Sequence, residues 1–209
     1  MGHVPANERP SRTLEGGLAV NTSVASHPSP TRPGPTPGGW RYYGQVRPPF
    51  AVAPAPGQES VWDYPRPPSI GAEPRQIVVR VGDVEVARTR RALRVLETAS
   101  PPTVYIPRAD VTLEYLQPAP GSSVCEWKGT ARYRTVRAAP MVLNAVGWSY
   151  DEPLPAFEAL RAHLSFYPAR SDYYVDAVRI KGQAGGFYGG WITPELVGPF
   201  KGDPGTSGW

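Results

Sequence analysis

One lysine in the middle of the chain stands where a ligand could approach its charge. Lys128 follows the aromatic residue Trp127 and precedes Gly129, which has no side chain to block the approach. This pattern suits either the binding of an anion or a desolvated base. The alternative interpretation is an exposed lysine at the end of a strand, beside a glycine that forms a bulge.

Glu97 is the second candidate, because it follows directly after the apolar run Leu93-Arg94-Val95-Leu96. A carboxylate in such a context either pairs with a cation or has a raised pKa. We therefore expect Glu97 to pair with Lys128 in a polar pocket, where the charged lysine would bind an anionic or carbonyl-bearing ligand. The alternative is a glutamate on an edge strand that faces water.

Aromatic residues on or beside the predicted strands could form the walls of this pocket. Ligand pockets are mostly apolar and aromatic, and a few polar groups in them orient the ligand. The residues with this predicted role are Trp127, Tyr133, Trp148, Tyr150 and Tyr167. The alternative is that they are ordinary core residues, since aromatic side chains on strands are usually buried.

The sequence offers few ligands for a metal and little for thiol chemistry. Cys125 is the only cysteine, so the chain cannot form an internal disulfide or a Cys-x-x-Cys zinc knuckle. His3 and His27 lie in the N-terminal segment, which leaves His163 as the only histidine of the predicted domain. We therefore expect no metal and no cofactor, a packed and inert Cys125, and a structural hydrogen-bonding role for His163.

Composition limits the class of protein and its partners. The 209 residues carry a net charge of +4, and the arginines are scattered rather than clustered, so nucleic-acid binding is unsupported. No stretch approaches the roughly 20 apolar residues of a membrane-spanning helix, and the early apolar group Leu18-Ala19-Val20 is too short for a signal peptide. We expect a cytoplasmic protein that binds no membrane, and the sequence leaves a homo-oligomer open.

The 27 prolines and 22 glycines divide the chain into four parts. Residues 1–40 are predicted to be a removable Pro/Gly-rich tail, and residues 41–75 an irregular arm of aromatic residues and prolines. Residues 76–181 should form the folded core domain. Residues 182–209 should form a Gly-rich segment that docks on the core through its aromatic side chains.

Runs typical of β-strands dominate the predicted core domain. The runs Ile77–Val81 and Val84–Arg88 flank Gly82-Asp83, which predicts a hairpin. Further strands are predicted at residues 93–98, 103–106, 111–116, 128–137 and 141–150. After Pro155, the residues Phe157, Leu160 and Leu164 share one face of a predicted helix. The fold class expected is therefore mainly β, with one short amphipathic helix.

Three motifs, taken in order, resemble a known family. They run from Cys125 to Tyr133, from Asn144 to Tyr150 and from His163 to Tyr167, and Glu97 and Tyr105-Ile106-Pro107 precede them. In these motifs the chain resembles domain of unknown function family 427. The flanking segments look like the longer subgroup of that family, so the likeness covers roughly residues 59–209.

The resemblance implies a compact folded sheet similar to the β-tent (Mss4-like) fold, in a family without an established activity. Members sometimes carry a nucleotidyltransferase-like label. The sequence does not support this label independently, because it has no Gly-Ser followed by an Asp-x-Asp pair and no P-loop.

The leading hypothesis is a small-ligand-binding domain, which could act as a metal-independent enzyme with Lys128 and Glu97 as its catalytic residues. The first alternative is a non-catalytic protein-interaction module that uses the Pro-rich tail and exposed aromatic residues. The second is the nucleotidyltransferase-like activity of the family label. A cavity in which a lysine and a carboxylate converge would favour the first hypothesis, and a filled core with an exposed apolar face would favour the interaction module.

Overall fold

The computed structural model describes residues 40–206, and the predicted tail therefore lies outside the described residues except for Trp40. Strands dominate the described part of the chain, which confirms the prediction of a mainly β fold. The likeness to a β-tent stays a prediction. Among residues 40–206, no helix is long and apolar enough to cross a membrane.

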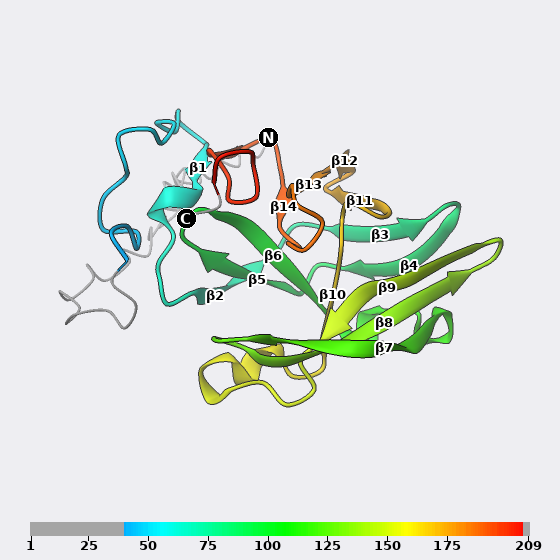
Figure 1. Ribbon diagram of the computed structural model, residues 1–209. Helices are drawn as coiled ribbons and strands as arrows, with labels where there is room; N and C mark the ends of the chain where they lie inside the picture. The colour runs from blue at the N-terminus through cyan, green and yellow to red at the C-terminus, as the bar shows by residue number, and fades with distance from the viewer. Residues whose placement is uncertain (1–39, 207–209) are drawn as a thin grey trace, which may run out of the picture. The chain divides into compact units, whose positions relative to one another are not determined.

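The largest sheet contains seven strands in the order β2-β5-β6-β10-β9-β8-β7, and all neighbouring pairs are antiparallel (Figure 1). The strands are β2 (Ser69–Glu73), β5 (Ala92–Glu97), β6 (Ser100–Pro107), β7 (Leu116–Cys125), β8 (Gly129–Ala138), β9 (Met141–Ser149) and β10 (His163–Phe166). Because β10 lies between β6 and β9, it brings two strands that are distant in sequence onto the same sheet.

A second sheet of four strands has the order β12-β11-β3-β4. Its strands are β3 (Ile77–Val81), β4 (Val84–Thr89), β11 (Asp172–Val175) and β12 (Val178–Arg179). The predicted hairpin is confirmed: Val81 pairs with Val84, and Gly82 has a φ of +58°, which glycine adopts without steric cost.

Short strand pairs and 3₁₀-helices complete the described part. The parallel pair is β1 (Glu59–Ser60) with β15 (Leu196–Val197), and the antiparallel pair is β13 (Lys181–Gly182) with β14 (Trp191–Ile192). The 3₁₀-helices are η1 (Val61–Asp63), η2 (Arg108–Asp110), η3 (Leu113–Tyr115) and η4 (Pro155–Leu160). The arm expected to be irregular thus contains β1, η1 and β2, because β15 and β5 supply the backbone partners that its own sequence does not reveal.

The strand predicted at residues 111–116 is wrong. Residues Leu113–Tyr115 form η3, and the strand β7 begins only at Leu116. β7 escaped prediction because it contains Pro118, Pro120 and Gly121, which usually mark turns. It is the last strand in the order of the sheet, where a proline does not remove a required hydrogen bond, and its register shifts between Pro118 and Ser122.

A helical segment does follow Pro155, but it is a 3₁₀-helix that ends at Leu160. Phe157 has a non-helical φ of −117°, which interrupts the helix. Phe157 and Leu160 are buried as predicted, whereas Leu164 lies on β10 and pairs with Ile106. Residues 163–166 instead pair with β6 and β9, and the sheet satisfies their backbone groups.

The described residues form two large hydrophobic clusters. The first is mainly aliphatic, and Trp191 of the C-terminal segment belongs to it with its ring 5.0 Å from that of Tyr173. The second is rich in aromatic residues and comprises Val95, Tyr105, Ala131, Trp148, Tyr150, Phe157 and Leu160. It lies against the cavity described below.

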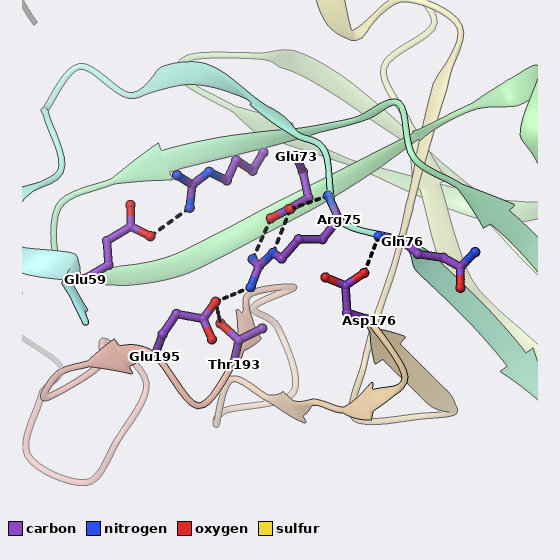
Figure 2. Close-up of polar contacts among 8 residues, drawn as sticks. Glu59, Glu73, Arg75, Gln76, Asp176, Thr193 and Glu195 are labelled. Atoms are coloured by element: carbon purple, nitrogen blue, oxygen red, sulfur yellow. Dashed lines mark hydrogen bonds and ion pairs between the residues drawn. The ribbon is translucent and has the colours of Figure 1, made fainter. Parts of the chain in front are cut away.

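An ion-pair network links the C-terminal segment to the strand β2 (Figure 2). Arg75 forms ion pairs with both Glu73 and Glu195, and its Nη2 lies 2.7 Å from Oε2 of Glu73. Thr193 donates a hydrogen bond of 2.7 Å to Glu195. The network therefore holds the residues around β15 against the largest sheet.

This network predicts a pH dependence of stability. Burial raises the pKa of Glu195, but hydrogen bonds from Thr193, from its own backbone and from Arg75 outweigh this effect and leave the pKa below its ordinary value. Its contribution is therefore fully present above the unfolded pKa of about 4.3 and is lost as the pH falls through the lower folded value. We expect Glu195→Gln to reduce the free energy of unfolding by about 1 kcal/mol at pH 7 and by less at pH about 3.

Denaturant unfolding at the two pH values measures this difference. Glu158→Gln is the matched control, because Glu158 pairs with Arg161 at an exposed i,i+3 position. Equal destabilisation by Glu195→Gln at both pH values would contradict the assignment.

Candidate functional site

A cavity of about 430 Å³ lies beside the aromatic cluster. Strands β5, β6, β7, β8 and β9 contribute to its lining, together with the C-terminal segment. The lining includes all seven residues predicted as site residues: Glu97, Trp127, Lys128, Tyr133, Trp148, Tyr150 and Tyr167. The sequence prediction thus selected residues that the fold does bring together.

The turn between β7 and β8 positions Lys128. Cys125 pairs with Gly129 across the hairpin, and Gly129 has a φ of +94°, which favours glycine at the end of the turn. The backbone N–H of Leu154 donates a hydrogen bond of 3.1 Å to the carbonyl oxygen of Lys128. The turn that carries Lys128 is therefore fixed to the segment before η4.

Lys128 presents its ammonium group to aromatic rings. Its Nζ lies 5.9 Å from the ring centre of Tyr150 and 6.0 Å from that of Phe157. Desolvation lowers the pKa of Lys128, but the Tyr105, Cys125 and Glu97 side chains raise it more, so the pKa lies above its ordinary value. At neutral pH the negative charge of Glu97 favours the charged ammonium form of Lys128.

Glu97 does not form the predicted direct pair with Lys128. Its Oε1 accepts a hydrogen bond of 3.0 Å from Nη2 of Arg66, and the Arg66 side chain is only 10% exposed. Arg66 was missed because it stands in a proline-rich stretch without periodicity, where nothing indicates which strand it approaches. Glu97 still acts on Lys128 through space, and both side chains line the same cavity.

Arg66 lines the cavity, and Trp40 lies beside it. The guanidinium carbon of Arg66 lies 4.8 Å from the ring centre of Trp40, and the Trp40 ring lies 5.6 Å from that of Trp127. The Nε–H of Arg66 is buried and has no hydrogen-bond partner among residues 40–206. Arg66 thus links the cavity lining to Glu97 and to the ring of Trp40.

Tyr105 is the most deeply buried aromatic residue of the lining, with 1% of its surface exposed. Its ring lies 6.3 Å from the ring of Trp148, at nearly a right angle, and 6.3 Å from that of Tyr150. Burial raises the pKa of Tyr105, and Lys128 lowers it in part. Sequence reasoning did not select Tyr105 for the site, although it belongs to the motif Tyr105-Ile106-Pro107.

The aromatic walls are also part of the core. Trp148 and Tyr150 are almost fully buried, yet both line the cavity. The Trp148 ring lies 4.4 Å from that of Tyr167. These residues are therefore both core residues and walls of the cavity, because one face of the aromatic cluster borders the cavity.

Tyrosine hydroxyls supply polar groups near these walls. The hydroxyl of Tyr133 donates a hydrogen bond of 2.9 Å to Oγ of Ser123. Burial, followed by interaction with Tyr133, raises the pKa of Tyr167 to about 12. The hydroxyl of Tyr167 therefore remains protonated at neutral pH and can donate a hydrogen bond.

The C-terminal segment supplies lining residues that sequence reasoning missed: Gln183, Phe187, Tyr188, Gly189 and Lys201. At Gly189 a Cβ atom would overlap the ring of Trp148, so the backbone lies directly on the indole. Cys125 also lines the cavity and is half-buried. The aromatic side chains of this segment predicted that it docks on the core, but they could not show that it forms a wall of the cavity.

His163 is not part of the cavity lining. It lies at the start of β10, and its Nδ1 is 3.0 Å from the carbonyl oxygen of Arg161. In the part of the chain that the structure describes, no group of three or more His, Cys, Asp or Glu side chains could hold a metal ion.

Fold and site together define a mainly β domain with an aromatic cavity that contains a cationic lysine. The chain belongs to the family described as Domain of unknown function (DUF427), whose model matches residues 69–177. No curated protein matches the chain. Arg66 and the C-terminal wall of the cavity lie outside the matched stretch.

Proposed function

We propose that this domain binds a small anionic ligand with a planar aromatic or conjugated body. The observation that carries the proposal is Lys128, a cation that lines an aromatic cavity and has no ion-pair partner within residues 40–206. A cation in such a place favours a ligand that brings the missing negative charge. The volume of about 430 Å³ is in the range of small-molecule sites.

Each lining group has a role in this proposal. Lys128 pairs with the negative group of the ligand, and Tyr105, Trp148 and Tyr150 pack against its planar body. Glu97 holds Arg66 at the edge of the cavity through their ion pair. Glu97 is in this view a positioning residue.

The raised pKa of Lys128 argues against the hypothesis that this residue is catalytic. A lysine that acts as a general base or forms a Schiff base needs a lowered pKa, so that its neutral amine is populated. The environment of Lys128 has the opposite effect. We therefore assign binding roles, rather than catalytic ones, to Lys128 and Glu97, and we extend no nucleotidyltransferase activity to this chain. The tail on which the interaction-module alternative depends lies outside the described residues.

Paired probes of the same shape test the proposal. We expect 2-naphthoate to bind at one site and to quench tryptophan fluorescence, because Trp127 and Trp148 line the cavity. The uncharged 2-naphthamide should bind about tenfold more weakly or worse, since it cannot form a charge-assisted contact with Lys128. Calorimetric titration of both probes measures the ratio. Equal affinities, or no binding of either probe at millimolar concentration, would overturn the proposal.

A further inference from the structure

The C-terminal wall of the cavity is fixed in place by hydrogen bonds. The buried Gln183 accepts a hydrogen bond of 3.2 Å from the N–H of Gly190 and donates one of 2.6 Å to the carbonyl oxygen of Lys201. The N–H of Lys201 donates a hydrogen bond of 2.7 Å to the carbonyl oxygen of Ala99, in the turn between β5 and β6. The backbone of Lys201 is therefore held from both sides.

Lys201 places a second ammonium group in the cavity lining. Its Nζ lies 5.9 Å from the ring centre of Tyr188. The charged residues of the lining are Arg66, Glu97, Glu126, Lys128 and Lys201. Arg66 and Glu97 pair with each other, and the two lysines outnumber the remaining carboxylate of the lining, the exposed Glu126.

A continuous series of contacts connects the two ammonium groups. The Nζ of Lys128 lies 5.9 Å from the ring centre of Tyr150, and the Tyr105 ring lies 6.3 Å from the rings of both Tyr150 and Trp148. The Trp148 ring lies under the backbone of Gly189, and the next residue toward the N-terminus is Tyr188, over which Lys201 lies. A series of neighbouring aromatic residues thus connects the two cations, and all of them line the same cavity.

The outer end of this surface is exposed. Phe187 lines the cavity but remains 68% exposed, and its ring stands edge-on to that of Tyr188 at 5.5 Å. A large apolar ring that is left in water beside a cation gains from being covered by a ligand with an apolar body.

We infer that the ligand is a planar dianion, with one negative group at Lys128, its aromatic or conjugated body along Trp148, and its second negative group at Lys201. This inference rests on the proposed function and deepens it, because it names the class of ligand. Lys201 is then a specificity-determining residue, contributed by a segment outside the stretch that matches the family.

Two probes that differ only in a second carboxylate test the inference. Calorimetric titration compares 2-naphthoate with 2,6-naphthalenedicarboxylate on the wild-type chain and on Lys201→Met. We expect the dianion to bind the wild type about tenfold more tightly, because it makes one more charge-assisted contact. In Lys201→Met this ratio should fall to about one, while the affinity for 2-naphthoate stays unchanged.

Lys181→Met is the matched control, since it removes an exposed charge from β13, directly before the C-terminal segment, but not from the cavity. This variant should keep the tenfold preference for the dianion. That result would show that the preference comes from a contact with Lys201 and not from the net positive charge of the protein. A ratio that survives in Lys201→Met, or a wild type that binds both probes equally, would overturn the inference and leave the proposed function standing. Failure of 2-naphthoate to bind the wild type would instead overturn the proposed function, and the inference with it.

Discussion

Lys128→Met should abolish most of the affinity for 2-naphthoate, with a dissociation constant raised about 10- to 100-fold. The substitution removes the ammonium group but keeps an unbranched apolar stem against Tyr150 and Phe157. A hydrogen bond to a charged group contributes about 1.5–3 kcal/mol, which corresponds to this change in affinity. Calorimetric titration gives the constant, and thermal unfolding shows whether the fold is preserved.

Stability should change little in this variant, because Lys128 makes no ion pair with a described residue that would be left unmatched. Lys181→Met serves again as the control for the loss of one positive charge. Unchanged binding in a folded Lys128→Met protein would show that the ligand is held elsewhere.

Trp191→Ala should produce the largest loss of stability, about 3–5 kcal/mol in the free energy of unfolding. Trp191 is only 1% exposed and contacts Tyr173, so its removal leaves a large cavity in the main core. Because β14 begins at Trp191, the loop that carries Tyr188 and Gly189 should also loosen. Denaturant unfolding measures the loss, and the preference for 2,6-naphthalenedicarboxylate should weaken in parallel.

Trp191→Phe separates packing from hydrogen bonding. The indole Nε1–H has no hydrogen-bond partner among residues 40–206, so phenylalanine loses volume but no hydrogen bond. We expect Trp191→Phe to cost clearly less than Trp191→Ala. An alanine variant as stable as the wild type would mean that the C-terminal segment is not an integral part of the fold.

Local patterns predicted the parts of the fold that depend on local chemistry. The β3–β4 hairpin follows from Gly82 and the alternating apolar residues around it. The strands β5, β6, β8 and β9 follow from β-branched and aromatic runs. The strands β7 and β10 could not be predicted in this way, because their stability comes from partners that are distant in the sequence.

The candidate site, too, could be predicted from the sequence only where local patterns indicate it. Lys128 and Glu97 were found from their immediate neighbours and from the family motifs, and both line the cavity. Their expected pairing is wrong, since Arg66 reaches Glu97 from a proline-rich segment whose path over the sheet no local pattern indicates. Lys201 was missed for the same reason: its place depends on hydrogen bonds to Ala99 and Gln183, which only the folded chain brings near.

A crystal structure of the chain with bound 2-naphthoate would test the central claim most directly. We predict one molecule of 2-naphthoate in the cavity, with its carboxylate within hydrogen-bond distance of Nζ of Lys128 and its rings against Trp148. A naphthoate bound outside the cavity, or one whose carboxylate turns away from Lys128 toward solvent, would contradict the account.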